Sequence, residues 1–232
     1  MSARRDELAG NLARVRHRIE EAATAANRDP ASIDLIVVTK YFPASDADLL
    51  ADLGVTQIGE NKDQEAGAKV DELTRRDSLT VHFIGQLQSN KANHVARYAD
   101  VVQSIDRPKI VRALDAAAQT HDRTLDVLVQ VSLDERTGRG GVAPDEANAL
   151  ADLVGETHCL NLRGVMAVAP LDGDPQRAFA RLRTVADGIR AGHPEATWIS
   201  AGMSGDLEAA VAEGATHLRV GSAILGSRPS LG

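Results

Sequence analysis

Two hydrophobic patterns alternate along the chain. Short runs rich in β-branched residues are almost continuously apolar, which is typical of strands buried on both faces of a parallel sheet. Longer segments rich in Ala and Leu carry apolar residues at helical spacing. We expect strands at Asp34–Lys40, Gln57–Glu60, Val81–Gly85, Val101–Ile105, Leu125–Val131, Leu162–Val168, Thr197–Ala201 and His217–Gly221. We expect helices at Ala3–Ala26, Ala44–Leu53, Lys62–Thr74, Lys91–Tyr98, Arg107–His121, Pro144–Glu156, Pro175–Gly192 and Leu207–Glu213.

Eight strands that alternate with helices predict an α/β protein built as a single TIM-type (β/α)8 barrel. The alternative is a doubly wound open sheet, but its G-x-G-x-x-G turn does not follow the first strand. A chain of 232 residues has the length of one α/β barrel. We therefore expect one domain over residues 1–232, with an extra N-terminal helix at about 3–26 and the barrel at about 33–230.

Composition narrows the classes of function. The net charge is −7, from 26 Lys and Arg against 33 Asp and Glu, which argues against a surface that tracks nucleic acid. The one cysteine, Cys159, excludes an internal disulfide and fits a reducing compartment; we interpret it as a small packed residue rather than a nucleophile. Met1–Glu20 has no apolar core, and no run approaches the ~20 apolar residues of a membrane span. We expect a cytoplasmic protein without nucleic-acid or membrane partners.

Lys40 ends the first expected strand, on the barrel face where ligands bind. A lysine surrounded by barrel interior is partly desolvated, and desolvation favours the neutral amine that attacks an aldehyde. Position alone leaves open a lysine that reaches the rim and pairs with Glu60 or Asp63.

Two turns of small residues follow the seventh and eighth strands, Gly202–Asp206 and Gly221–Gly226. Such turns let backbone N–H groups and hydroxyls surround an anion, and barrels commonly hold phosphate after strands 7 and 8. The alternative is that the glycines only allow tight turns and that Asp206 caps a helix. Opposite a strand-end lysine, the two turns together indicate a phosphorylated aldehyde.

Arg219 lies two residues before Gly221, so both fall on one face of the last strand. If that face points inward, a permanent cation enters the pocket; the alternative is an arginine ion-paired within the barrel. We interpret His82 as a hydrogen-bonded core histidine. The seven histidines show neither H-x-H nor H-E-x-x-H spacing, so we expect no transition-metal site.

Seven segments give the chain a resemblance to a known family. They are VVTKYFPAS around Lys40, IGENKDQE from Ile58, HFIGQLQSNK from His82, QSIDR from Gln103, RGVMAVAP from Arg163, GMSGDLEAAV from Gly202 and LRVGSAILGSR from Leu218. In these segments the sequence resembles the pyridoxal phosphate homeostasis proteins, the YggS/PROSC group. The segments run in order from the first strand to the last, so the resemblance covers nearly the whole chain.

This resemblance implies a fold-type III protein related to the alanine racemase N-terminal domain, with pyridoxal 5′-phosphate (PLP) as a Schiff base on Lys40. By motif match, Ser204, Gly221 and Ser222 hold the phosphate and Arg219 faces the pyridine nitrogen. A cation there opposes protonation of that nitrogen and weakens the electron sink of the ring. Asn61 and Met203 complete the cofactor-binding residues that the resemblance implies.

Two positions depart from the pattern of many family members. A second lysine commonly follows the PLP lysine by two residues, and here that position is Phe42. Many members also have a lysine in the loop that corresponds to Thr137–Gly141, where this chain has Arg139. If those lysines transfer PLP or bind it secondarily, that part of the family behaviour does not carry over to this chain.

The resemblance implies a monomeric, non-catalytic PLP carrier that takes part in intracellular PLP (vitamin B6) homeostasis and contacts PLP-dependent apo-enzymes transiently. One alternative is a PLP enzyme acting on amino acids, a racemase or a lyase. A racemase needs a second base, which related enzymes take from a C-terminal domain; this chain ends eleven residues after Gly221, and we expect Tyr41 and Tyr98 on the helical side of the strand ends. Another alternative is a barrel that binds a phosphorylated metabolite without covalent attachment.

Overall fold

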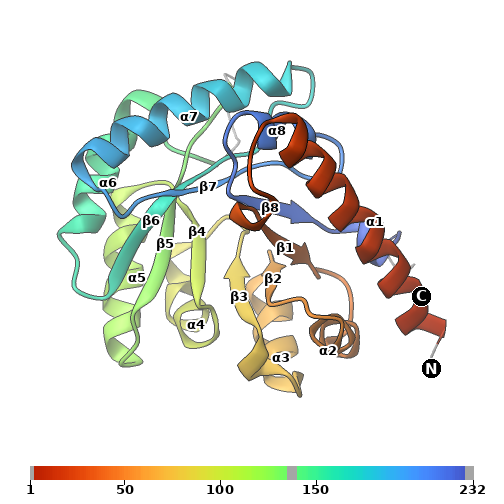
Figure 1. Ribbon diagram of the computed structural model, residues 1–232. Helices are drawn as coiled ribbons and strands as arrows, with labels where there is room; N and C mark the ends of the chain where they lie inside the picture. The colour runs from red at the N-terminus through yellow and green to blue at the C-terminus, as the bar shows by residue number, and fades with distance from the viewer. Residues whose placement is uncertain (1–2, 135–139, 228–232) are drawn as a thin grey trace.

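The computed structural model describes residues 3–134 and 140–227. Within these ranges eight parallel strands pair in chain order and close into a barrel (Figure 1). The strands are β1 (Asp34–Val38), β2 (Gln57–Glu60), β3 (Thr80–Phe83), β4 (Val101–Ile105), β5 (Leu125–Gln130), β6 (Leu160–Met166), β7 (Trp198–Ser200) and β8 (His217–Val220). The (β/α)8 barrel predicted from the sequence is confirmed.

Helices surround the barrel: α1 precedes the first strand, α9 follows the last, and the others lie between successive strands. They are α1 (Ala3–Ala25), α2 (Ala44–Asp52), α3 (Asp63–Glu72), α4 (Ala92–Tyr98), α5 (Pro108–Thr120), α6 (Ala147–Gly155), α7 (Pro175–Gly192), α8 (Leu207–Ala212) and α9 (Ser222–Leu225). Short 3-10 turns lie at η1 (Pro30–Ser32), η2 (Arg76–Ser78), η3 (Ser89–Lys91) and η4 (Pro144–Glu146). In the two described ranges, no helix is both long and apolar enough to cross a membrane.

The strands are buried on both faces, as their sequences indicate. All five residues of β4 are buried, and the last three of β1 and of β2 are buried as well. One face of each strand packs into the barrel and the other packs against the surrounding helices, so polar alternation is absent.

The first strand is shorter than expected. Strand β1 ends at Val38, because the carbonyl of Thr39 accepts a hydrogen bond from the backbone N–H of Phe42 (3.0 Å) and closes a turn. Tyr41 occupies the left-handed region with φ 72°, a conformation that a tyrosine adopts only where its surroundings hold it. Lys40 therefore lies in a tight turn and not in the strand itself.

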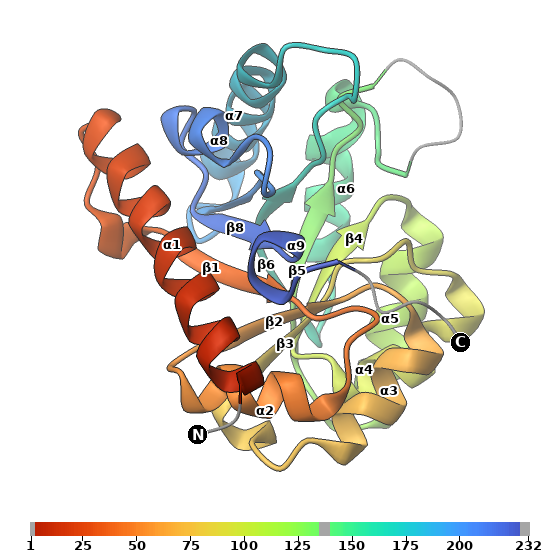
Figure 2. The same ribbon diagram turned by 90° about the vertical axis from the view of Figure 1, so that its right-hand side faces the viewer.

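The N-terminal helix α1 lies on the outside of the barrel, against α8, α9 and α2 (Figure 2). Its buried residues include Leu8, Leu12, Val15 and Ile19, which the helical period places on one face. These apolar residues belong to the hydrophobic core, and the helix contacts the short helices α8 and α9.

Candidate functional site

The family resemblance implies seven cofactor-binding residues, and six of them line one cavity of about 370 Å³. The cavity is lined by Val38, Lys40, Tyr41, Phe42, Met203, Ser204, Gly205, Arg219, Gly221, Ser222, Gly226 and Ser227. These residues come from the turn after β1, the loop after β7, strand β8 and helix α9. Parallel strands place all these positions at the same end of the barrel, where barrels bind their ligands.

Lys40 is half-buried, and in the part of the chain that the structure describes it forms no ion pair. The expected alternative partners are already engaged, since Glu60 pairs with Lys69 and Asp63 pairs with His94. The alternative of a lysine paired with Glu60 or Asp63 is therefore wrong. An amine without a carboxylate partner is better suited to attack an aldehyde.

Tyr41 does not lie on the helical side of the strand end, so that expectation is wrong. Tyr41 lines the same cavity as Lys40, and the Lys40 amine lies 5.9 Å from the centroid of the Tyr41 ring. The alternation of side chains along a strand does not apply here, because both residues belong to the turn. Tyr98, in contrast, is buried in α4, where burial raises the pKa of its hydroxyl well above the usual range.

A buried ion pair supports the backbone next to Lys40. The amine of Lys69 in α3 lies 2.6 Å from a carboxylate oxygen of Glu60 in β2, and both side chains are less than a tenth exposed. The same amine donates to the backbone carbonyl of Thr39 (2.7 Å), and the Thr39 hydroxyl donates to Glu60 (2.6 Å). Two hydrogen bonds, each with one charged partner, thus hold Thr39, the residue that precedes Lys40, and the ion pair between Lys69 and Glu60 holds those two partners together.

The loop after β7 is held closed by reciprocal bonds. The side chain of Asp206 accepts from the backbone N–H of Met203 (2.6 Å), and the Asp206 N–H donates back to the Met203 carbonyl (3.2 Å). Gly202 has φ 89°, and a Cβ at this position would lie 2.6 Å from the Cβ of Ala210. Asp206 stands at the N-cap position of α8 without a capping bond from its side chain to the helix, so the alternative of a simple cap is wrong.

Arg219 ends a chain of hydrogen bonds through the barrel interior. Its guanidinium donates to the Ser200 hydroxyl (2.6 Å) and to the Ala167 carbonyl (2.8 Å). Because the Ser200 oxygen accepts from Arg219, its own proton is donated to the Gln103 amide oxygen (2.7 Å). The Gln103 amide then donates to Nδ1 of His82 (2.9 Å), so the proton of the neutral His82 ring lies on Nε2.

The cavity therefore holds a cation bonded to neutral groups. Burial lowers the pKa of Arg219 to about 10, so the guanidinium stays charged at neutral pH, and its bonded partners Ser200 and Ala167 carry no negative charge. Burial likewise lowers the pKa of His82 to about 3 and that of His217 to about 4, which keeps both rings neutral. The interpretation of His82 as a hydrogen-bonded core histidine is confirmed. Among the residues that the structure describes Arg219 forms no ion pair, so the ion-paired alternative is wrong. Such a cavity suits an anion.

Asn61 lines a different cavity, of about 470 Å³, after β2 and β3. Its side-chain oxygen is buried and has no hydrogen-bond partner among the described residues. The backbone there is tightly packed, because a Cβ on Gly85 would lie 2.0 Å from the Asn61 carbonyl oxygen. Asn61 is thus the one implied cofactor-binding residue that does not line the cavity of Lys40.

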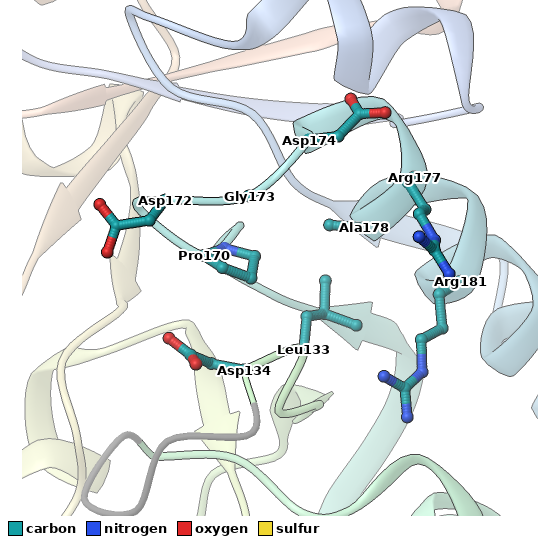
Figure 3. Close-up of a pocket in the computed structure, with 9 residues that line it drawn as sticks. All are labelled: Leu133, Asp134, Pro170, Asp172, Gly173, Asp174, Arg177, Ala178 and Arg181. Atoms are coloured by element: carbon teal, nitrogen blue, oxygen red, sulfur yellow. The ribbon is translucent and has the colours of Figure 1, made fainter.

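A third cavity, of about 570 Å³, lies where β5 and β6 lead into their loops and α7 begins (Figure 3). Arg177 and Arg181 lie along one side of it, and the carboxylates of Asp134 and Asp172 lie on the opposite side. Arg139, at which the resemblance implies a departure from the family pattern, lies outside the described residues. No group of three or more His, Cys, Asp or Glu side chains in the described ranges is arranged to hold a metal ion.

Comparisons with other proteins agree with the geometry. The family described as "Alanine racemase, N-terminal domain" matches residues 10–229. A pyridoxal phosphate homeostasis protein of Mycobacterium tuberculosis is 42% identical over 243 residues, covering 97% of this chain and 94% of that protein. The structure of PipY from Synechococcus elongatus with PLP bound is 34% identical, with a TM-score of 0.82, and covers 94% of this chain and 100% of that chain.

A more distant likeness concerns the fold alone. The crystal structure of alanine racemase from Corynebacterium glutamicum has a TM-score of 0.72 at 17% identity, over 98% of this chain and 62% of that chain. The barrel is thus shared with a racemase.

Proposed function

This chain belongs to the alanine racemase N-terminal domain family, and we propose that it is a PLP-binding protein of intracellular PLP (vitamin B6) homeostasis. The observation that carries the proposal is the shared cavity of Lys40, Ser204, Arg219 and Ser222. One nucleophilic amine, two hydroxyls and one permanent cation there match the aldehyde and the phosphate of PLP. PLP bound to PipY and the homeostasis proteins at about 40% identity support the same assignment.

Each residue has a distinct part in holding PLP. The Lys40 amine would hold the cofactor as a Schiff base through its aldehyde, while Ser204, Gly221 and Ser222 would hold the phosphate. Arg219 would lie toward the pyridine nitrogen, and because its guanidinium can only donate hydrogen bonds it would oppose protonation of that nitrogen. Met203 would contact the cofactor from the loop after β7. Asn61, which follows β2, would be a further contact.

The proposed role is that of a carrier without a reaction of its own. When bound, PLP supplies an electron-withdrawing ring that can labilise bonds of an attached amino acid. A cation beside the pyridine nitrogen weakens that effect, which supports a carrier over an enzyme. The carrier is proposed to act as a cytoplasmic monomer of one domain and to pass PLP to apo-enzymes in transient contacts.

One observation favours a second candidate function, an enzyme acting on amino acids. Tyr41 and Lys40 line one cavity, with the Lys40 amine 5.9 Å from the Tyr41 ring centroid, so two residues that can transfer protons lie beside each other. Exchange of the α-proton of amino acids with deuterated water separates the two functions. A carrier gives no exchange above that of free PLP; exchange that Tyr41→Phe and Lys40→Ala both abolish would establish the enzyme.

The binding proposal is tested by the colour of the protein. Purified protein is incubated with PLP, desalted, and examined by visible absorption beside Lys40→Ala and Lys62→Ala. Lys62 is a matched control because its amine also lies near the Tyr41 ring (5.1 Å) but does not line the cavity. The wild type and Lys62→Ala should be yellow and Lys40→Ala colourless. A colourless wild type that still binds PLP in equilibrium dialysis would instead indicate non-covalent phosphate binding.

A further inference from the structure

We infer that the N-terminal helix α1 positions the phosphate-binding loops, and that Arg18 is the positioning residue that makes the site selective for a phosphorylated ligand. The inference rests on the proposed function, because it concerns the residues there assigned to the phosphate. It assigns a role to a helix that contributes no side chain to the cavity lining.

Arg18 joins α1 to the loop after β7. Both terminal nitrogens of its guanidinium donate to the backbone carbonyl of Ser204, each at 3.2 Å. The same side chain donates to one carboxylate oxygen of Glu208 at 3.0 and 2.7 Å. Glu208 lies in α8, directly after the loop, so Arg18 is held in place by the element that it binds.

Two more residues of α1 bind the C-terminal end of α9. The Asn11 amide donates to the carbonyl of Ile224 (2.8 Å), and the Arg4 guanidinium donates to the carbonyl of Leu225 (3.1 Å). Arg4 is itself fixed by the buried carboxylate of Asp46 in α2 (2.7 Å). The last carbonyls of a helix lack partners within the helix, and in a four-residue helix these two bonds supply them.

Both sets of bonds hold segments that are proposed to bind the phosphate. Ser204 belongs to one proposed phosphate loop, and Ser222 begins the four-residue helix α9 after Gly221. One helix thus bonds both to the loop after β7 and to α9, the two elements proposed to hold the phosphate. The apolar face of α1, with Leu8 and Val15 buried, keeps the helix in place without Arg18.

The hydrogen bonds from Arg18 also strengthen the backbone N–H of Gly205 as a hydrogen-bond donor. The Ser204 carbonyl belongs to the same peptide group as the N–H of Gly205, which lines the cavity. A cation that donates to this carbonyl polarises the peptide and strengthens the N–H as a donor toward an anion. The effect concerns a phosphate and not the aldehyde or the ring, so it separates ligands with and without phosphate.

The test compares PLP with pyridoxal, which has the same aldehyde and ring but no phosphate. Wild type, Arg18→Ala, Arg18→Lys and Arg16→Ala are titrated with each ligand, and the bound ligand is trapped on the protein with borohydride and quantified by intact mass. Arg16 is the matched control, because it lies on the same helix and donates to a backbone carbonyl, that of Gly54 (3.0 Å), away from the phosphate loops.

We expect Arg18→Ala to weaken PLP binding on the order of tenfold, from the loss of charged hydrogen bonds to a part-exposed site, with pyridoxal binding unchanged. Arg18→Lys keeps one cationic donor and should fall between Arg18→Ala and the wild type. Arg16→Ala should match the wild type with both ligands.

Equal loss of PLP and pyridoxal in Arg18→Ala would overturn the inference, because it would show a general effect on the fold. Unchanged binding of both ligands would overturn it as well, and would leave the proposed function intact because the wild type still binds. A wild type that traps neither ligand would overturn the proposed function and this inference with it.

Discussion

Replacing Lys69 by Met should destabilise the fold strongly, although the residue lies outside the cofactor cavity. Glu60 is 1% exposed and Lys69 8% exposed, so the substitution leaves a carboxylate in the interior without its cation. Breaking a buried ion pair from one side costs about 3–5 kcal/mol. Since 1 kcal/mol shifts the midpoint of a chain of this size by about 2–4 °C, Tm should fall by roughly 6–20 °C.

The assay is thermal and urea unfolding of Lys69→Met, Glu60→Gln and the double variant. The double variant leaves no unpaired charge in the interior, so its loss should be clearly smaller than the sum of the two single losses. Lys62→Met is the control, because the pair that it breaks, Lys62 with Glu65, is about half exposed and such pairs contribute about 0–1 kcal/mol.

Lys69→Met should also weaken PLP binding, since the amine donates to the Thr39 carbonyl that precedes Lys40. A Tm for Lys69→Met within about 2 °C of the Lys62→Met control would show that Glu60 does not depend on the Lys69 cation. Strictly additive losses in the double variant would contradict the prediction too, because they would show that the two charges do not depend on each other.

Three further predictions concern the buried histidines, Gly202 and Tyr41. His82 and His217 have folded pKa values of about 3 and about 4, below the value of about 6.5 in the unfolded chain. The unfolded chain therefore binds more protons below pH 6.5, and stability is lost as the pH falls toward 4; His82→Gln should remove about 2 kcal/mol of the difference between pH 7 and pH 5 in urea unfolding. An unchanged difference would contradict the burial of a neutral ring. Gly202→Ala, at φ 89° and with 2.6 Å to the Ala210 Cβ, should cost about 1–3 kcal/mol in the same assay and weaken PLP binding, whereas wild-type stability would mean that the loop adapts freely. Tyr41→Phe should retain the yellow colour of the PLP-loaded protein, and its loss would mean that the hydroxyl is needed for attachment.

The sequence predicts the barrel and most of the cavity because topology determines which strand ends meet. Lys40, Ser204 and Ser222 lie far apart in the chain, yet each follows a strand of one parallel sheet, so they converge at one end of the barrel. The turn at Tyr41 is not predictable in this way. The β-branched residues before the turn, Val37 to Thr39, make the strand pattern continue to Lys40. No sequence pattern predicts a tyrosine in the left-handed conformation.

The supporting contacts could not be predicted because they join elements without a fixed spacing. Arg18 and Ser204 are 186 positions apart, and their bond depends on how α1 crosses the loop after β7. Lys69 and Glu60 are nine positions apart on different elements, where no helical or strand period relates them. Helix α9 has four residues, which is too short for a hydrophobic period.

Identifying the lysine that holds PLP tests the proposed PLP site most directly. The protein is loaded with PLP, reduced with borohydride, digested, and its peptides are mapped by mass spectrometry. The other candidates are Lys62, Lys69, Lys91 and Lys109. We expect a phosphopyridoxyl group on Lys40 at one equivalent per chain. A label spread over exposed lysines, or located on any lysine other than Lys40, would contradict it.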